Sequence, residues 1–179
     1  MSRQQEVDQW MMTVKQHLPH LSKPQATVLA LWSFGGVIVG ACGCSSVAGF
    51  LAQVLSQKEN TVRQRLREWY WEATAKQGDQ RQSVVAATCF APLLAWVLAW
   101  WAPDEPRLAL ALDATTLAQR FTVLAVSVVY RGCAIPVAWV VLRATDAGAW
   151  RPYWLTLLSD LASRVPVSWT VIVLADRGL

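Results

Sequence analysis

The amino-terminal half of the chain carries apolar residues at the spacing of helix faces. Residues 7–18 show this periodicity, and residues 24–57 form an uncharged stretch that divides near residues 40–43 into two helix-compatible segments. After a turn-like stretch, residues 61–76 predict a further helix capped by Thr61. The apolar face of this last helix is formed by Val62, Leu66, Trp69 and Ala73.

The pattern changes in the carboxy-terminal half. A polar run over residues 77–83 is a natural joint, and an apolar helix over 84–101 and a breaker over 102–106 follow it. Segments rich in β-branched and aromatic residues then predict strands over 107–116, 121–130, 133–142 and 169–176, with a helix over 150–164 between the last two.

The predicted fold class is therefore α+β or α/β, with three parts. A helical region occupies residues 1–83, an apolar helix and linker occupy 84–106, and a mixed sheet in the order β-β-β-α-β occupies 107–179.

Composition narrows the function classes. The chain is 54% hydrophobic and 16% charged, which argues against disorder. A formal net charge of +4 is compatible with a polyanionic partner such as DNA. No signal peptide opens the chain, and the Cys42–Cys44 pair has no second cysteine or histidine pair at metal-ligand spacing. We therefore expect buried, reduced thiols in a cytoplasmic protein, and neither a zinc site nor disulfides.

Two aspartates are candidates for chemistry. Asp113 lies inside an otherwise apolar strand, and Asp176 ends another. Each is expected to project from the core of one sheet, where an unpaired carboxylate is costly unless it meets a cation. If the strands are adjacent and parallel, the pair is suited to hold Mg²⁺ for phosphoryl chemistry. The alternative is that both accept hydrogen bonds at strand ends near turns.

Two segments resemble the catalytic blocks of bacterial insertion-sequence transposases of the DDE class. ALDATTLAQRFTVLAVSVVYRGCAIPVAWVVL (111–142) looks like the first block, and WTVIVLADRGL (169–179) looks like the second. The resemblance implies a ribonuclease-H-like catalytic domain, with Asp113 and Asp176 as the first two metal-binding acids of a two-Mg²⁺ site. It implies DNA cleavage and strand transfer, with the terminal inverted repeats and target DNA as partners and no small-molecule substrate.

The family carries a third acid, a glutamate downstream of the second aspartate, and no such residue follows Asp176 within the 179 residues. The other acids of this half precede Asp176 and are expected in a linker, a loop or a helix: Asp104, Glu105, Asp146 and Asp160. We therefore expect an amino-terminal fragment that does not catalyse by itself. An incomplete sheet with an unpaired edge predicts low solubility.

Residues 45–73 read as helix, turn and helix, which is typical of DNA-binding regions. The candidate phosphate contacts are Lys58, Arg63, Arg65 and Arg67. The alternative is an ordinary solvated helix face. The resemblance favours binding to the inverted repeats, a nucleoid location, and a second copy or a full-length transposase as the protein partner.

Two other interpretations remain at the level of sequence. The uncharged windows 24–57 and 82–103 have the length of membrane spans, which predicts a small membrane protein with one or two spanning helices. A stand-alone DNA-binding regulator of a full-length transposase keeps the basic helix and has no catalytic role.

Overall fold

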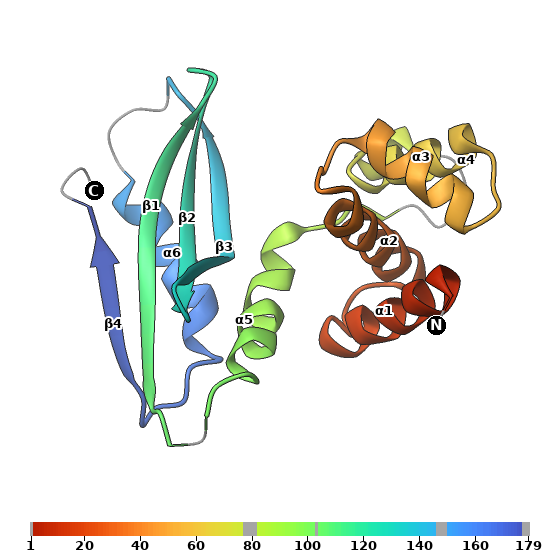
Figure 1. Cartoon of the computed structure of the whole chain (residues 1–179). Helices are drawn as coiled ribbons and strands as arrows, with labels where there is room; N and C mark the ends of the chain where they lie inside the picture. Colours follow the sequence, from red (N-terminus) through yellow and green to blue (C-terminus); the bar gives the residue numbers. More distant parts are fainter. Residues whose placement is uncertain (1, 77–81, 103, 146–149, 177–179) are drawn as a thin grey trace. The chain divides into compact units, whose positions relative to one another are not determined.

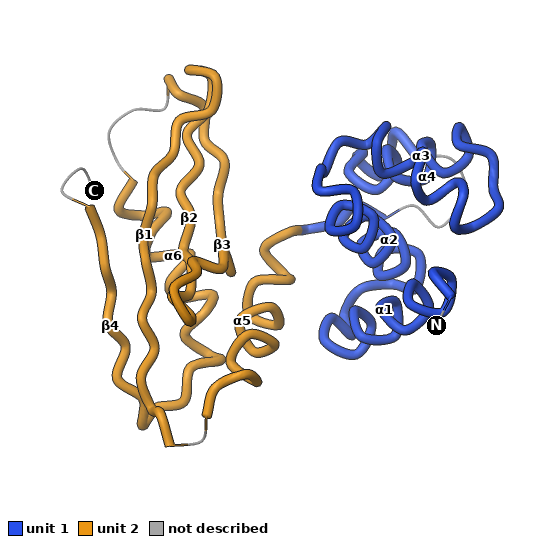
Figure 2. The backbone as a smooth tube through the Cα atoms, viewed as in Figure 1, with its two compact units in different colours: residues 1–85 blue, residues 86–179 orange. Residues whose placement is uncertain are grey.

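The change from helical to strand periodicity coincides with a division of the chain in the computed structural model. The structure describes residues 2–76, 82–102, 104–145 and 150–176. Residues 1–85 form unit 1 and residues 86–179 form unit 2 (Figure 2). The boundary lies just beyond the polar run that the sequence pattern marks as a joint.

Four helices build unit 1 within its described residues (Figure 1): α1 (Arg3–His17), α2 (Lys23–Val39), α3 (Cys44–Val54) and α4 (Glu59–Trp69). Capping sets where the first two begin. The Ser2 N–H donates to Gln5 Oε1 at 2.8 Å, and the Ser22 N–H donates to Gln25 Oε1 at 2.9 Å. The helices share one core, made of Val7, Val28, Leu31, Val47, Ala48, Leu51, Val62 and Leu66.

The predicted break between two apolar helices is present between α2 and α3. Gly40 caps α2 in the left-handed conformation, with φ of 69°, and Gly43 precedes α3. Among the described residues, no single helix is both long and apolar enough to cross a membrane. Only α2 and α3 taken together meet those criteria, and they are bent by 99° at the break.

Helix α4 differs from the predicted helix over 61–76. It begins at Glu59, so Thr61 lies inside its first turn, and it ends at Trp69. The Trp69 indole N–H donates to the carbonyl oxygen of Gln25 at 3.1 Å, which ties the end of α4 to the start of α2. The helix therefore ends earlier than its local pattern indicates, and its last residue contacts a distant part of the chain.

Beyond α4 the chain forms the short 3₁₀ turn η1 (Ala73–Ala75). The Ala73 N–H donates to Ser83 Oγ at 2.8 Å, so this donor is satisfied by a side chain outside any helix. The sequence pattern placed Ala73 on the apolar face of this helix, and that prediction is wrong because α4 ends at Trp69.

Unit 2 is a mixed α+β unit with a four-stranded sheet in its described residues. The chain order is η2 (Ala86–Cys89), α5 (Phe90–Leu98), β1 (Arg107–Leu117), β2 (Phe121–Tyr130), β3 (Cys133–Arg143), α6 (Arg151–Ala162) and β4 (Thr170–Ala175). The strands lie in the order β3-β2-β1-β4. β1, β2 and β3 form an antiparallel meander, and β4 pairs parallel to β1.

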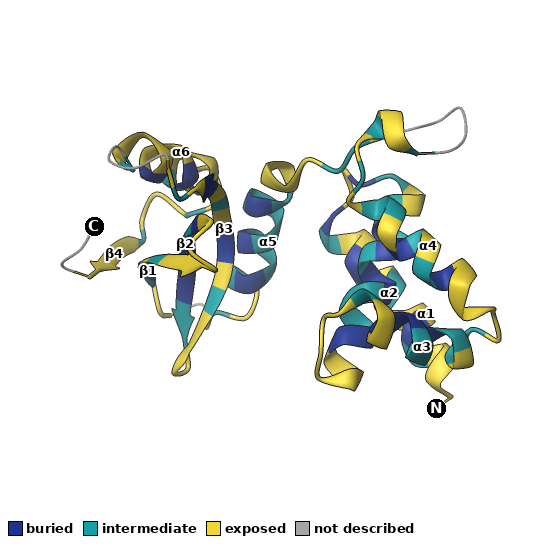
Figure 3. Cartoon of the chain, turned by 90° about the horizontal axis from the view of Figure 1, so that it is seen from above, coloured by how far each residue is buried: buried dark blue, intermediate teal, exposed yellow. Residues whose placement is uncertain are grey.

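The core of unit 2 lies between one face of the sheet and α6, with α5 beside β3 (Figure 3). Phe90, Leu94 and Val97 of α5 belong to this core, so the helix of the predicted linker region packs as part of unit 2. Helix α6 contributes Trp154 and Leu157.

The opposite face of the sheet, here called the open face, is largely exposed. By register and strand alternation it contains Ala109, Ala111, Asp113, Ala125, Trp139, Ile172 and Leu174. Trp139 is 36% exposed, Ile172 46% and Leu174 50%. Every residue of β4 is exposed, and β1 is its one neighbouring strand among the described residues.

Candidate functional site

Strands β1 and β4 bring Asp113 and Asp176 to the same place in the sheet. The last pair of the parallel ladder is Leu112 with Ala175, and each aspartate is the next residue along its chain. Backbones of neighbouring strands lie about 4.8 Å apart, so the two carboxylates leave adjacent points of the sheet. Because Leu112 packs against the core, alternation assigns Asp113 to the open face, and Asp176 directly follows the end of β4.

Both aspartates are exposed, which corrects the expectation that they project from the core. For Asp113 the physical reason is alternation, since its neighbours Leu112 and Ala114 pack against the core cluster. Asp176 follows β4, all of whose residues are exposed. Thr115 lies on the same face as Asp113 and donates its hydroxyl to Asp113 Oδ2 at 2.5 Å. Thr115 was not singled out in the sequence, although its position two residues after Asp113 in a strand indicates a shared face.

The other acids of unit 2 lie elsewhere. Asp104 and Glu105 precede β1 and therefore lie at the opposite end of the sheet, and Asp160 is on α6. Asp146 lies outside the described residues. Within the described part of the chain, no group of three or more His, Cys, Asp or Glu side chains is arranged to hold a metal ion.

The predicted DNA contacts lie on or next to α4 but do not share one face: Lys58, Arg63, Arg65 and Arg67. Arg63 and Arg67 are four residues apart and lie on one flank, and Arg65 lies on the other. Arg63 forms an ion pair with Glu59 at 2.5 Å. The Arg67 guanidinium lies over the Trp71 ring, 5.6 Å from its centroid. Two of the four cations are therefore engaged locally.

The outermost face of α4 carries amide side chains. Val62 and Leu66 are buried, and helical periodicity points Asn60 and Gln64 away from them, where both are exposed. Gln64 Nε2 donates to Glu68 Oε1 at 2.8 Å. Asparagine and glutamine are the side chains that pair with adenine edges in DNA grooves. Asn60 and Gln64 are uncharged, so the charge pattern does not indicate them. The spacing of the buried residues Val62 and Leu66 does, because it places Asn60 and Gln64 on the opposite side of the helix.

The cysteines differ in exposure. Burial raises the pKa of the Cys89 thiol, and a hydrogen bond with Thr88 partly opposes this shift. Cys42 and Cys133 are exposed and Cys44 is half-buried. Cys42 is exposed because it lies in the break between α2 and α3, which corrects the expectation that its thiol is buried.

Comparisons of the chain with protein-family models, with curated proteins and with solved structures found no significant match.

Proposed function

We propose that the chain belongs to a DDE-type insertion-sequence transposase and carries two of the three acids of its catalytic centre. The observation that carries this proposal is the parallel register of β1 and β4, which ends immediately before Asp113 on one strand and Asp176 on the other. Two carboxylates at adjacent points of a sheet repel each other unless a cation lies between them. Both side chains are exposed to solvent, as contact with a large substrate requires.

The sheet supports a ribonuclease-H-like assignment for unit 2. Such a domain is expected to have its first acid on the first strand and its second at the end of the fourth, with the four strands in one sheet. The order β3-β2-β1-β4, with β4 parallel to β1, supports this assignment. It makes neighbours of two strands that are far apart in the sequence.

The donor set fits a hard divalent cation such as Mg²⁺. Asp113 and Asp176 supply carboxylate oxygens, the ligand type that Mg²⁺ prefers. When bound, Mg²⁺ activates the attacking oxygen and stabilises the leaving oxygen of a phosphodiester. The chain's own contribution is to hold the carboxylates on adjacent strands, and the Thr115 hydroxyl orients Asp113 by donating to Oδ2.

The proposed reaction is hydrolysis of a phosphodiester at each end of the element, followed by attack of the freed 3′ hydroxyl on target DNA. It requires a third acid, which the described residues do not place beside Asp113 and Asp176. We therefore expect the pair alone to bind Mg²⁺ weakly and not to cleave DNA.

Unit 1 is proposed to bind the terminal inverted repeats through α4. Helix α4 follows α3 after a short turn and packs on the same core, so its outer face is presented by a folded support. Asn60 and Gln64 are placed to contact bases, and Lys58, Arg63, Arg65 and Arg67 to contact phosphates. Because unit 1 has its own core, a DNA-binding regulator that lacks catalysis is the second candidate function.

The test of the metal site uses Mn²⁺ as a paramagnetic substitute for Mg²⁺. We expect Mn²⁺ to broaden the backbone amide signals around Asp113 and Asp176. Asp113→Asn or Asp176→Asn should weaken this binding by about tenfold or more, because ligand-shell losses cost at least that much. Asp160→Asn on α6 removes the same charge from the same unit and should leave it unchanged. Equal Mn²⁺ binding by all three variants would contradict the proposed metal site.

A further inference from the structure

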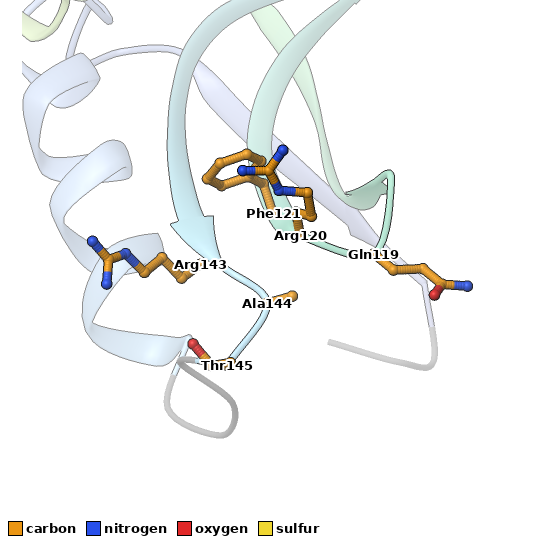
Figure 4. A pocket seen from close by; sticks show the side chains of 6 residues that line it. All are labelled: Gln119, Arg120, Phe121, Arg143, Ala144 and Thr145. Atoms are coloured by element: carbon orange, nitrogen blue, oxygen red, sulfur yellow. The ribbon is translucent and has the colours of Figure 1, made fainter.

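A pocket of about 480 Å³ lies at the end of the sheet toward which β1 runs from Asp113. It is lined by the turn between β1 and β2 and by the end of β3 (Figure 4). The described lining residues are Gln119, Arg120, Phe121, Arg143, Ala144 and Thr145. No part of the proposed metal site belongs to this pocket.

The lining has the chemistry of an anion site. Two of its described residues are arginines, and none of them is an acid. The Arg120 guanidinium lies over the Phe121 ring, 5.5 Å from its centroid, as Figure 4 also shows. Stacking limits the freedom of the guanidinium while its edge keeps N–H donors available. A planar, fixed guanidinium is well suited to bind a phosphate through two hydrogen bonds.

The backbone that presents Arg120 is held in an unusual conformation. Ala118 and Gln119 both have positive φ, 49° and 55°, where glycine or asparagine is the usual residue. The Arg120 N–H donates to the Leu117 carbonyl at 3.0 Å, and the Ala144 N–H donates to the Arg120 carbonyl at 2.9 Å. The second of these bonds fixes the turn against the end of β3, so both halves of the pocket are held together.

The distance from the two carboxylates to the pocket is suited to the backbone of an extended polymer. Asp113 and Leu117 are on the same strand, and four residues of strand span about 13 Å. That length corresponds to about four base pairs along the axis of B-DNA. A nucleic-acid backbone whose scissile phosphate lies at Asp113 and Asp176 can therefore reach the pocket with a phosphate a few nucleotides away.

We infer that the Arg120 and Arg143 pocket binds a backbone phosphate of the same DNA molecule that reaches Asp113 and Asp176. The inference rests on the proposed function and adds a positioning contact in unit 2, separate from α4. Its role is to fix the direction in which the duplex crosses the open face. Sequence patterns do not indicate the site, because only strand register brings the two arginines to the same pocket.

The experiment measures the affinity of the complete 179-residue chain for a fluorescent 20-base-pair duplex, by anisotropy, over a range of salt concentrations. Arg120→Ala should reduce the slope of log affinity against log salt by about 0.9, the value for one phosphate contact in B-DNA. Arg120→Lys keeps the charge and should keep the slope. Thermal melting of each variant verifies that it is folded.

Arg131→Ala is the matched control. Arg131 also lies in a hairpin turn with positive φ, and its guanidinium lies 5.2 Å from the centroid of the Tyr130 ring, but at the other end of the sheet. The Arg131→Ala substitution should leave the slope of log affinity against log salt unchanged. If the unaltered chain binds DNA but Arg120→Ala and Arg131→Ala give equal slopes, phosphate binding in the pocket is contradicted and the proposed function is not. Absence of binding by the unaltered chain would overturn both the pocket and the proposed function.

Discussion

At the scale of single residues, Gly35 and Gly36 are neighbours in α2 that differ in the space available for a side chain. A Cβ on Gly35 would lie 2.7 Å from Val47 Cγ1 and 3.4 Å from Leu51 Cγ, so α3 packs directly against this backbone. A Cβ on Gly36 would meet its nearest atom, Cys42 Sγ, at an ordinary 3.6 Å. Only Gly35 is therefore needed for the close approach of α2 and α3.

We expect Gly35→Ala to destabilise unit 1 and Gly36→Ala to stabilise it. Overpacking against the stiff Val47 side chain costs about 1–3 kcal/mol, whereas alanine gains about 1 kcal/mol over glycine in a helix interior. Chemical denaturation followed by helical circular dichroism measures both. Because the gain in propensity is common to the two variants, their difference isolates packing, and equal stabilities would contradict the close contact.

The sequence predicts residue types at the carboxylate site better than residue environments. Asp113 and Asp176 are identifiable because each interrupts an apolar run, and the register that makes them neighbours is consistent with that pattern. Their exposure was not predicted, because the sequence does not state which face of a strand a helix will cover. Arg120 and Arg143 could not be paired at all from sequence, since only the register of β2 with β3 brings their backbones together.

At the scale of elements, the two edge strands of the sheet differ in how they are protected. β3 contains Pro136 and an irregular register opposite Val126 and Ser127, both of which hinder pairing with another strand. β4 is a short apolar strand, with Val171 41%, Val173 48% and Leu174 50% exposed. An edge of this composition is a template for intermolecular pairing.

We expect Ile172→Lys in β4 to reduce aggregation of the chain several-fold, because a charge on an edge strand opposes stacking of further strands. Val141→Lys is the control, since Val141 is 54% exposed on the already protected strand β3. The soluble fraction after high-speed centrifugation measures the difference. If both substitutions improve solubility equally, the effect is one of net charge and the β4 edge is not the cause.

Element boundaries were predictable where local chemistry sets them. The hairpin turns and Gly40 mark the ends of β2, β3 and α2 in the sequence as in the structure. The end of α4 at Trp69 differs from the local pattern, and the hydrogen bond from Trp69 to Gln25 joins residues that are far apart in the chain. The start of α1 is signalled by the Ser2–Gln5 capping box, which apolar periodicity alone does not detect.

At the scale of the whole molecule, each unit has a separate hydrophobic core. Leu51 is fully buried in unit 1, and Leu124 is fully buried in unit 2. The two clusters share no residue, so the described contacts give each unit its own source of stability.

Leu51→Ala and Leu124→Ala should therefore each destabilise one unit by about 2–5 kcal/mol and leave the other unaffected. Hydrogen exchange resolved by residue reports the opening free energy of each unit in the same sample. Faster exchange throughout the chain in either variant would show that the two units unfold as one cooperative body.

The parallel pairing of β1 with β4 also sets the order in which the sheet assembles. The antiparallel hairpins close through short turns, whereas joining Leu112 to Ala175 closes a loop of about 60 residues, which costs about 2 kcal/mol more chain entropy. Among the described residues only β1 pairs with β4 to compensate for that cost, so we expect β4 to join last during folding and to open first. The two aspartates are therefore expected to come together, and to separate, with the pairing of a single strand.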